Sequence, residues 1–566
     1  MFQDKIRENN KIMVTYKELA DYIFQDVHET IDDLEKRYPQ RNLPAGAEVT
    51  RFAPSPTGFL HLGSLFMSLV ASKVAYDTKG VFYIRLEDTD TKREIEGSGA
   101  QLIEQLEHFG IVPDEGYLGD DEKGNYGPYV QSKRAHIYRV CIKYLMEQGR
   151  AYPCFCSHEQ IEEIRSVQEA MKVIPGYYGE YAMCRNINPE EALKRIKAGE
   201  KYVIRFRSLG NHNNKVTFHD LIRGDISIAE NDLDVVIMKS DGLPTYHFAH
   251  AVDDHFMRTT TVLRGEEWIA SAPIHLELFR ALKFPLPNYA HAPVIMKLDN
   301  GNRRKLSKRK DPEASVAHFI EEGFPKEALK AYLMSIANSN FEEWTVENHS
   351  FDIDKFKFSF DKMSLDGVLF DQGKLNYFSK EIIASFTAND FYHRLVEWSK
   401  DYDEVLYNHI KDKEEYVTKI LNIERGGEKA RKDFTFYKEV YPIIGFFFND
   451  RYEEIVKDGY PFNTNMDKNV IKDVLIDFMN SNDYSLANDV WFNSIKELGG
   501  RHKFAESNKV YKANKDAYLG HVGDVAEMIR IALVGAKNSP NLHSVIQILG
   551  KEEVDRRIKK VVEYLG

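Results

Sequence analysis

Residues 51–64 combine two prolines, two glycines and a histidine at the point where a β-prone segment meets an apolar helical pattern. The run reads Arg-Phe-Ala-Pro-Ser-Pro-Thr-Gly-Phe-Leu-His-Leu-Gly-Ser. Gly58 and Gly63 allow the backbone to approach a ligand closely. A helix that begins next to His61 offers unpaired N–H groups and a positive dipole end, which bind phosphate. The simpler interpretation is a tight strand–helix connection with a surface histidine.

Residues 303–310 place six basic side chains in eight positions, and only Leu306 and Ser307 interrupt them. Like charges at this density repel one another unless an anion neutralises them. The chemistry expected of such a loop is charge stabilisation at a phosphate. A solvated basic loop is the simpler alternative, and for charge runs in general it is the more common one.

These clusters must be positioned by a folded core, and the pattern around them predicts an α/β fold. Residues 48–52 and 81–86 are β-prone, and residues 65–74 between them have a helical pattern. Strand, helix and strand in this order indicate a βαβ unit with a parallel sheet. Because ligands of such sheets bind at the carboxyl ends of the strands, both clusters lie where a ligand would be expected.

The rest of the chain divides by its pattern. Residues 153–234 mix charged helical runs with short strands such as 202–206, which predicts an insertion. The apolar segments 235–238 and 260–263 are expected to be buried strands of the returning core.

After about residue 325 the pattern is mainly helical. Gly-Gly pairs at 426–427 and 499–500 predict turns within that region. Residues 1–45 precede the first strand and have apolar side chains at helical spacing, so they predict a helical extension whose role is open.

The run 51–64 resembles the His-Ile-Gly-His-type signature of class I aminoacyl-tRNA synthetases, in the Arg-x-Ala-Pro-Ser-Pro-Thr-Gly form of the bacterial-type glutamyl branch. The order Lys-Leu-Ser-Lys-Arg in 305–309 resembles the Lys-Met-Ser-Lys-Ser-type loop of the same enzymes. Ser64 departs from the first signature, because a second histidine would stand there. Substitution at this position is common in glutamyl enzymes, so activity is still expected. The resemblance is strong over residues 48–390 and weaker beyond them.

By this resemblance the fold class is α/β: a class I synthetase Rossmann-like parallel sheet with an inserted α+β acceptor-binding domain, followed by all-α anticodon-binding domains. The expected domains are the N-terminal helical extension 1–45, the first Rossmann half 46–152, the acceptor-stem-binding insertion 153–234, the second Rossmann half with the lysine-rich loop 235–324, a stem-contact region 325–390 and a helical anticodon-binding region 391–566.

The resemblance also implies a reaction: ATP-dependent activation of L-glutamate to glutamyl-adenylate, with Mg²⁺, and transfer to the 3′ end of tRNA-Glu. Activation is expected to need bound tRNA, and whether tRNA-Gln is also charged stays open. No side-chain nucleophile is required, because catalysis rests on positioning and charge stabilisation. The residues implied for catalysis and ATP binding are Gly58, His61, Gly63, Glu267, Lys305 and Lys308, of which His61, Gly63, Lys305 and Lys308 are the catalytic ones.

Glutamate carries an ammonium group and two carboxylates, so its pocket needs cations, an anion and oriented donors. The resemblance assigns Arg51 and Tyr246 to the side-chain carboxylate, Arg264 to one of the two carboxylates and Glu87 to the ammonium group. For each residue alone a surface salt bridge would be the simpler interpretation. The full set of residues implied for glutamate binding is Arg51, Ala53, Ser55, Glu87, Tyr246, His250 and Arg264.

Three of the four cysteines fall in the predicted insertion: Cys154, Cys156 and Cys184. They resemble the zinc-binding insertion of some glutamyl-tRNA synthetases. Tetrahedral Zn²⁺ needs a fourth ligand, for which Tyr181, His158 and Glu180 are the candidates. Buried apolar thiols are the alternative interpretation.

Two segments connect the helical region to RNA. Residues 361–371 and 374–375 resemble the start of the tRNA stem-contact region, and residues 548–557 resemble the end of the bacterial helical anticodon-binding domain. An ordinary helical bundle is the alternative. Unpaired anticodon bases are recognised by stacking and by hydrogen bonds to their edges, but the sequence does not identify the contacts.

Composition limits the alternatives. The net charge of −12 argues against indiscriminate nucleic-acid binding but allows a locally basic RNA surface. The sequence has no run of 18 or more apolar residues, so a membrane span is not expected, and the N-terminus lacks a signal pattern, so a cytoplasmic location is expected. The family resemblance implies a monomer. Glutaminyl-tRNA synthetase and a non-catalytic RNA-binding descendant of a synthetase are the rival interpretations; the second would be expected to lose pocket residues that are all present here.

Overall fold

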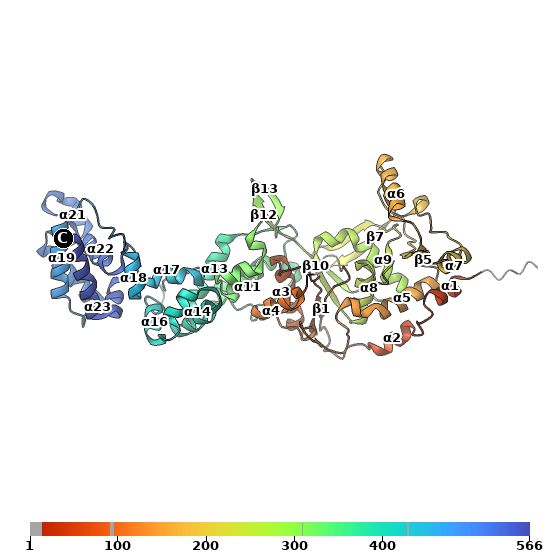
Figure 1. The fold of residues 1–566 in the computed structure, drawn as a ribbon, viewed down its shortest axis with the longest axis horizontal. Helices are drawn as coiled ribbons and strands as arrows, with labels where there is room; N and C mark the ends of the chain where they lie inside the picture. Colours follow the sequence, from red (N-terminus) through yellow and green to blue (C-terminus); the bar gives the residue numbers. More distant parts are fainter. Residues whose placement is uncertain (1–13, 91–94, 308–309, 427–429) are drawn as a thin grey trace, which may run out of the picture. The chain divides into compact units, whose positions relative to one another are not determined.

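The computed structural model describes residues 14–90, 95–307, 310–426 and 430–566 (Figure 1). The chain divides into two compact units. The first comprises Met1–His318 and Lys330–Asp371, and the second comprises Phe319–Leu329 and Gln372–Gly566. The parallel sheet and the segment 51–64 belong to the first unit, whereas the second unit is mainly helical. The predicted α/β class with a helical C-terminal region is confirmed.

The centre of the first unit is a pair of adjoining sheets. Strands β1 (Val49–Phe52), β2 (Val81–Ile84) and β3 (Glu115–Tyr117) pair in parallel, and β4 (Glu122–Lys123) pairs antiparallel with β3. Strands β10 (Thr261–Gly265) and β11 (Asn288–Ala292) are also parallel. The backbone N–H of Thr260 donates to the Val49 carbonyl over 3.0 Å, so β10 lies beside β1. The predicted βαβ unit is confirmed.

Helix α3 (Leu62–Asp77) connects β1 to β2 and packs on β1, β2 and β10. It is buried along most of its length, including Leu65, Phe66 and Leu69. A helix that is apolar on nearly all sides is stable only inside a core. The same sheet is flanked by α4 (Ser98–His108), α5 (Ala135–Glu147), α8 (Tyr246–Phe256) and α9 (Ala272–Leu282).

A second, antiparallel sheet is formed by β5 (Ala151–Cys154), β6 (Val203–Phe206) and β9 (Val236–Met238), of which only β6 lies wholly in the predicted insertion. The predicted buried strand at 235–238 is confirmed, but it pairs with β6 and not with β1 or β10, so its assignment to the sheet of the returning core is wrong. Ile237 is fully buried, but it is buried in this smaller sheet, and an apolar run does not specify which sheet receives it. The other insertion elements are α6 (His158–Ala170), α7 (Pro189–Lys197), β7 (Lys215–Asp220) and β8 (Gly224–Ala229), and β7 pairs with β11.

The N-terminal segment forms α1 (Tyr16–Ile23) and α2 (Ile31–Arg37), which pack on α5. Thr15 and Thr30 begin these helices with reciprocal capping hydrogen bonds, which satisfy N–H groups that the first turn leaves unpaired. Arg41 then forms a two-pronged ion pair with Glu115 of β3, at 2.9 and 3.0 Å. The described part of the segment thus packs on α5 and β3.

Residues 303–305 of the lysine-rich cluster lie on β13 (Asn302–Lys305), which forms a hairpin with β12 (Ile295–Asp299), and β14 (Val368–Leu369) pairs with β12. Helices α10 (Val316–Glu322), α11 (Lys326–Ala337) and α12 (Phe341–Asn348) follow.

The second unit is built from helices around one apolar core that includes Phe391, Trp491 and Ile558. Gly499 and Gly500 lie inside α20 and not in a turn, so that prediction is wrong. A Cβ on Gly499 would touch Phe504 and Val525 at 3.4 Å, which indicates close packing. Its elements are α13 (Gln372–Ser385), α14 (Ala388–Tyr402), α15 (Glu404–Ile410), α16 (Glu414–Leu421), α17 (Val440–Ile444), α18 (Asn449–Ile455), α19 (Lys468–Ser481), α20 (Asn488–Arg501), β15 (Phe504–Ala505), α21 (Asn508–Ala513), β16 (Gly520–His521), α22 (Val522–Val534) and α23 (Leu542–Leu565).

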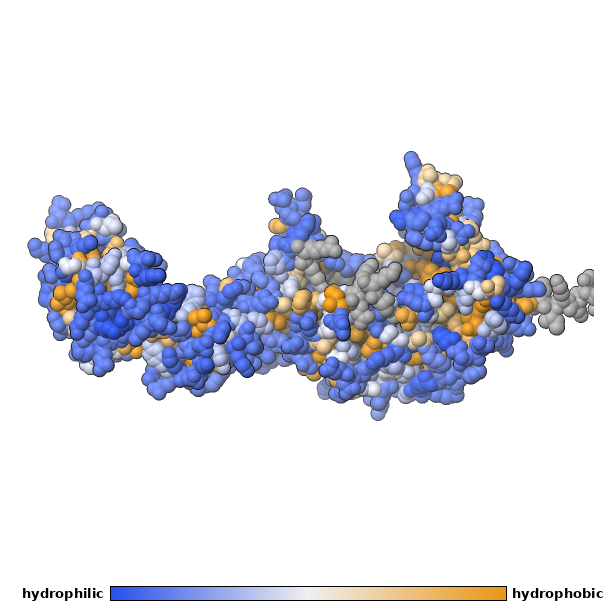
Figure 2. All heavy atoms as spheres, in the orientation of Figure 1, coloured by the Kyte–Doolittle hydropathy of each residue, from blue (hydrophilic) through white to orange (hydrophobic). Residues whose placement is uncertain are grey.

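Hydrophilic side chains dominate the face shown in Figure 2. Apolar side chains are exposed at the end of α6, where Met171 and Ile174 are 62% and 68% exposed. In the described part of the chain, no helix has both the length and the apolar character needed to cross a bilayer.

Candidate active site

A cavity of about 1130 Å³ opens in the first unit at the carboxyl ends of β1 and β10. This position follows from the parallel topology, because loops at that edge converge. Six of the seven residues predicted to bind glutamate line it: Arg51, Ala53, Ser55, Glu87, Tyr246 and Arg264. Lining residues that the sequence reasoning did not identify include Gln131, Lys239 and Trp268.

Arg51 is 6% exposed and its charge is already compensated. Its Nε atom donates to Asp254 Oδ1 over 3.2 Å, and Nη1 donates to the Leu263 carbonyl over 3.3 Å. Burial alone would raise the pKa of Asp254, but the guanidinium groups of Arg51 and Arg85 hold it well below its usual range. Asp254 is therefore an ionised partner behind the pocket.

Asp254 belongs to a buried network that joins β1, β2 and α8. Arg85 Nη1 donates to Asp254 Oδ1 over 2.6 Å, and Nη2 donates to Glu87 over 3.1 Å. Arg134 donates to Asp253 over 2.6 Å. Three arginines face three carboxylates: Arg51, Arg85 and Arg134 against Glu87, Asp253 and Asp254. The sequence signal that could have identified this network is the adjacent pair Asp253 and Asp254 in a helix that is buried over most of its length.

Glu87 occupies the edge of this network that faces the cavity. Burial raises the pKa of Glu87, although Arg85 opposes that rise. Gln131 donates to Glu87 over 3.4 Å and to Asp253 over 3.0 Å. A cation bound in the cavity would stabilise the ionised form of Glu87.

Arg264 also lines the cavity, but its neighbours differ from those of the arginines in the buried network. Its Nε donates to His291 Nε2 over 2.9 Å, and Nη1 lies 3.1 Å from His275 Nδ1. The guanidinium carbon lies 4.7 Å from the centre of the Tyr289 ring. Nη2 is buried and has no hydrogen-bond partner among the described residues. Arg264 lines the cavity and has no carboxylate partner among the described residues, so its charge is suited to an acceptor supplied by a ligand.

Tyr246 lines the cavity and its ring centre lies 4.3 Å from that of Trp268. His250 does not line the cavity: it is fully buried and its ring stacks behind Tyr246 at 6.0 Å. Its Nδ1 lies 2.8 Å from Asp254, and Nε2 lies 3.2 Å from the Tyr289 hydroxyl. Burial lowers the pKa of His250 to about 3, so the ring is neutral.

The first cluster forms the turn into α3. His61 is the N-cap, and its Nδ1 accepts from the Gly63 N–H over 2.9 Å, which leaves the proton of the neutral ring on Nε2. Gly58 has φ of +115°, a conformation that favours glycine. His61 forms a β-bridge with Ser315, and Val316 N–H donates to Leu60. The segment that follows the lysine-rich cluster therefore lies against the first cluster.

Acidic side chains neutralise part of the positive charge of the second cluster. Lys305 pairs with Glu267 over 2.8 Å, and both are about half exposed. Arg304 forms a two-pronged pair with Asp311, at 2.6 and 2.8 Å. Asp311 also accepts from the Ser307 N–H, so it holds the turn after β13 closed. Lys308 lies outside the described residues, so the prediction that it and His61 contact the same nucleotide stays a prediction.

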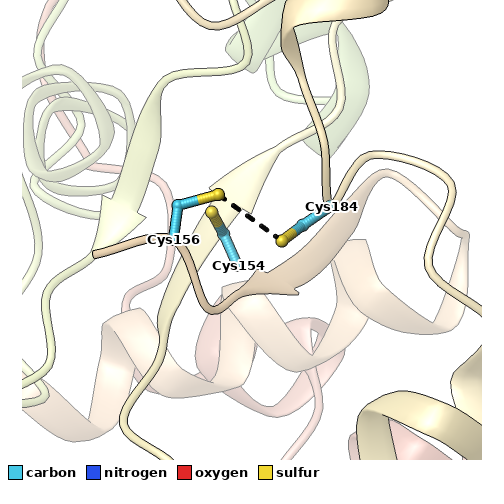
Figure 3. A group of neighbouring side chains, drawn as sticks. All are labelled: Cys154, Cys156 and Cys184. Atoms are coloured by element: carbon cyan, nitrogen blue, oxygen red, sulfur yellow. Dashed lines mark hydrogen bonds between the residues drawn. The ribbon is translucent and has the colours of Figure 1, made fainter. Parts of the chain in front are cut away.

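The three cysteines of the insertion converge, as Figure 3 shows. Their sulfur atoms lie within 4.8 Å of one another. The hydroxyl of Tyr177, which the sequence reasoning missed, lies 3.4 Å from Cys154 Sγ and 3.2 Å from Cys156 Sγ. The candidate fourth ligands His158 and Glu180 are exposed and do not join the group. Tyr181 instead directs its hydroxyl toward Met171, 3.7 Å away.

The second unit has a separate cavity of about 640 Å³ between α20, α22 and the start of α23. Phe492 is 38% exposed at this cavity, and Trp491 lies at the base of the same helix face. Arg431, Lys496 and Arg530 also line it. Aromatic surface beside cations is suited to an unpaired nucleobase and its phosphates.

Two family profiles match the chain. The profile described as tRNA synthetases class I (E and Q), catalytic domain, matches residues 48–367. The profile described as anticodon binding domain matches residues 512–562, which include Arg530 of the second cavity.

Named relatives match nearly the whole chain. A glutamate--tRNA ligase of Acetivibrio thermocellus is 46% identical over 548 residues, covering 97% of this chain and 100% of the relative. A glutamate--tRNA ligase of Clostridium perfringens is 44% identical, covering 97% and 99%. The crystal structure of a glutamate tRNA ligase from Elizabethkingia meningosepticum in complex with its amino acid superposes with a TM-score of 0.73 at 28% identity, covering 92% of this chain and all of that one.

The buried network leads to a stability prediction. Asp254→Asn leaves Arg51 and Arg85 without their shared partner, so the free energy of unfolding should fall by about 3–5 kcal/mol. Because the folded-state pKa of Asp254 lies below its unfolded value, its stabilisation is present above about pH 4 and is lost as pH falls through the folded pKa. Urea unfolding at pH 7 and at acid pH measures both effects.

The matched control is Asp225→Asn, whose carboxylate is 76% exposed beside His219. It should change stability by less than about 0.5 kcal/mol. Equal losses in the two variants, or an unchanged acid transition for Asp254→Asn, would contradict the network.

Proposed function

We propose that this chain, which belongs to the class I tRNA synthetases and within them to the glutamate--tRNA ligases, activates L-glutamate with ATP and transfers it to the 3′ end of tRNA. The observation that supports the substrate most directly is the cavity itself. It is lined by a buried carboxylate, Glu87, and by a guanidinium, Arg264, that has no carboxylate partner among the described residues. An amino acid with an acidic side chain complements both.

In this proposal Glu87 binds the ammonium group of glutamate, and the cation compensates for the burial that raises the pKa of Glu87. Arg264 and Tyr246 hold the side-chain carboxylate, with Arg51 beside them. Ala53 and Ser55 line the entrance. His250 acts as a positioning residue, because its ring supports Tyr246 from behind and does not reach the cavity.

The nucleotide is proposed to lie at the start of α3. The helix N-terminus and the Nε2–H of His61 would donate to its phosphates, and Gly58 and Gly63 allow close approach. Lys305, Lys308 and Glu267 would face the same nucleotide. Mg²⁺ accompanies ATP and neutralises charge on its phosphates.

In the first step, an oxygen of the glutamate α-carboxylate attacks the α-phosphorus of ATP, and pyrophosphate leaves. Lys305 and Lys308 stabilise the negative charge that develops on the phosphate oxygens. In the second step, a hydroxyl of the 3′-terminal ribose attacks the activated carbonyl carbon, and AMP leaves. Side chains position and stabilise, and none forms a covalent bond to the substrate.

The test is aminoacylation with labelled glutamate and glutamine against purified tRNA-Glu and tRNA-Gln. Glutamate on tRNA-Glu is expected, and charging of glutamine instead would support the glutaminyl alternative. Lys305→Ala should lower kcat on the order of 100-fold, because a donor to the transition state is removed. Lys310→Ala, a basic residue of the same loop, should change kcat less than about threefold. Equal effects would remove Lys305 from catalysis.

We further propose that the cavity of the second unit binds an unpaired base of the anticodon, with Phe492 as the stacking surface. Phe492→Ala should raise the KM for tRNA about 10-fold and leave the KM for glutamate unchanged, since stacking contributes about 1–3 kcal/mol per base. Val490→Ala is the matched control, because Val490 is exposed on the same helix but does not line the cavity. An unchanged KM for tRNA in Phe492→Ala would contradict the assignment.

The cysteine cluster is proposed to hold Zn²⁺ through Cys154, Cys156, Cys184 and the Tyr177 hydroxyl. Three sulfurs and one oxygen converge there, the number of ligands that Zn²⁺ takes in closed sites. When bound, the ion would cross-link β5 to residues 177–184. The guanidinium of Arg205 lies 3.9 Å from the Tyr177 ring, a cation that favours an anionic ligand set.

Protein purified without chelator should contain about one zinc per chain by mass spectrometry. Tyr177→Phe should release zinc to a competing chelator on the order of 10-fold more readily, whereas Tyr181→Phe should not. Wild-type protein free of zinc would leave these residues as core thiols.

The sequence-based expectations of a monomer and of a cytoplasmic location are kept as proposals. Light scattering of the purified chain at several concentrations tests the first.

A further inference from the structure

Arg264 differs from the other arginines at the base of the cavity in what surrounds its charge. Arg51, Arg85 and Arg134 each lie 2.6 to 3.2 Å from an aspartate oxygen. No carboxylate oxygen of the described residues lies within 4.0 Å of Arg264. Its two hydrogen-bond partners are imidazole rings instead.

The geometry fixes the protonation of both rings. A guanidinium group only donates, so His291 Nε2 and His275 Nδ1 must each accept with a lone pair. The proton of His291 then sits on Nδ1, 2.6 Å from Asp220 Oδ2. The proton of His275 sits on Nε2, 3.0 Å from His247 Nδ1. Each ring is therefore held neutral, with its donor directed away from Arg264.

The surroundings keep these rings neutral. His275 and His291 are both fully buried. Burial lowers the pKa of His275 well below its usual range, and the nearby rings of His250 and His247 and the charge of Arg264 lower it further. Asp254 opposes this at His275, and His250 contacts both of them. Asp220, 2.6 Å from Nδ1, opposes it at His291, whose pKa burial nevertheless lowers. A protonated imidazole here would be repelled by Arg264.

The guanidinium of Arg264 is therefore held in place by two neutral imidazole acceptors and not by carboxylates. Arg264 lines the cavity, and neither imidazole partner supplies a negative charge that would compensate for its guanidinium. In the proposed function the α-carboxylate attacks ATP, so Arg264 is assigned to the side-chain carboxylate.

We propose that His275 and His291 are specificity-determining positioning residues, which keep the charge of Arg264 uncompensated so that the pocket requires a side-chain carboxylate and rejects the neutral amide of glutamine. The inference rests on the proposed function, because it takes glutamate as the substrate. It adds the prediction that selectivity depends on the absence of charge on two residues that do not touch the substrate.

Two substitutions of His275 test the effect of a negative charge beside Arg264. His275→Gln offers Arg264 a neutral oxygen acceptor, and His275→Glu offers an acceptor of the same length that carries a negative charge. In aminoacylation of tRNA-Glu, His275→Gln should keep the KM for glutamate within about threefold of wild type. His275→Glu should raise it about 10- to 100-fold, the loss expected when a hydrogen bond to a charged group is already satisfied internally.

The kcat, the KM for ATP and inhibition by glutamine distinguish a loss of Arg264 positioning from a general loss of activity. For His275→Glu, kcat at saturating glutamate and the KM for ATP should stay within about threefold, and inhibition by glutamine should be unchanged. The ratio of glutamate to glutamine affinity should therefore narrow. Equal KM increases in the two variants, or a fall in kcat with KM unchanged, would overturn the inference.

A second variant covers the case in which His275→Glu does not fold, as judged by near-ultraviolet circular dichroism. Asp220→Asn removes the carboxylate that fixes the proton of His291 on Nδ1, so a fraction of His291 can direct a donor at Arg264. The KM for glutamate should rise about 3- to 10-fold with kcat retained, and an unchanged KM would again overturn the inference. A wild-type enzyme that does not charge glutamate would refute the proposed function itself and is recognised before any variant is compared.

Discussion

The buried set of Arg51, Arg85 and Arg134 against Glu87, Asp253 and Asp254 is the constraint on which the site depends. A buried charge is tolerated only when a partner compensates for its lost hydration. The pairs connect β1, the end of β2, the turn before α5 and helix α8, so none of these elements can shift without leaving a charge unpaired. The network thereby holds the floor of the cavity in place.

The N-terminal segment closes the outer side of this network. The Tyr38 ring lies 6.0 Å from the guanidinium carbon of Arg134, and the Tyr38 carbonyl accepts from Arg258 at the end of α8. Glu35 pairs with both His255 and Arg258. Residues that the sequence predicts only as a helical extension therefore stabilise the position of the helix that carries Asp253 and Asp254.

Local sequence patterns predicted the elements and the motif residues, because turn chemistry and periodicity are written within a few neighbouring positions. The strands near 49–52 and 81–84 and the helix between them were predicted for that reason. Long-range partners were not. Arg85 meets Asp254 across 169 positions, and Tyr177 meets Cys154 across 23.

The errors have the same origin. An apolar segment such as 235–238 specifies burial but not the sheet that it joins, and the Gly-Gly pair at 499–500 is helical because Gly499 packs against Phe504 and Val525. Likewise the six basic residues of 303–310 suggest an unneutralised loop, whereas Asp311, only slightly further on, already pairs with Arg304. Local composition indicates which charges are present, and the fold determines which remain uncompensated.

That distinction explains how an acidic protein, with net charge −12, can carry selective sites for anions. The average charge sets non-specific attraction, whereas recognition depends on the few cations that the fold leaves without partners. Most arginines around the cavity are neutralised by carboxylates and serve as structure. Arg264 is held by imidazole lone pairs, so the same type of side chain, a few ångströms away, remains available to a substrate. Selectivity here depends on which arginines are paired with carboxylates and which are not. The contacts between strands and helices that are distant in sequence determine those pairs.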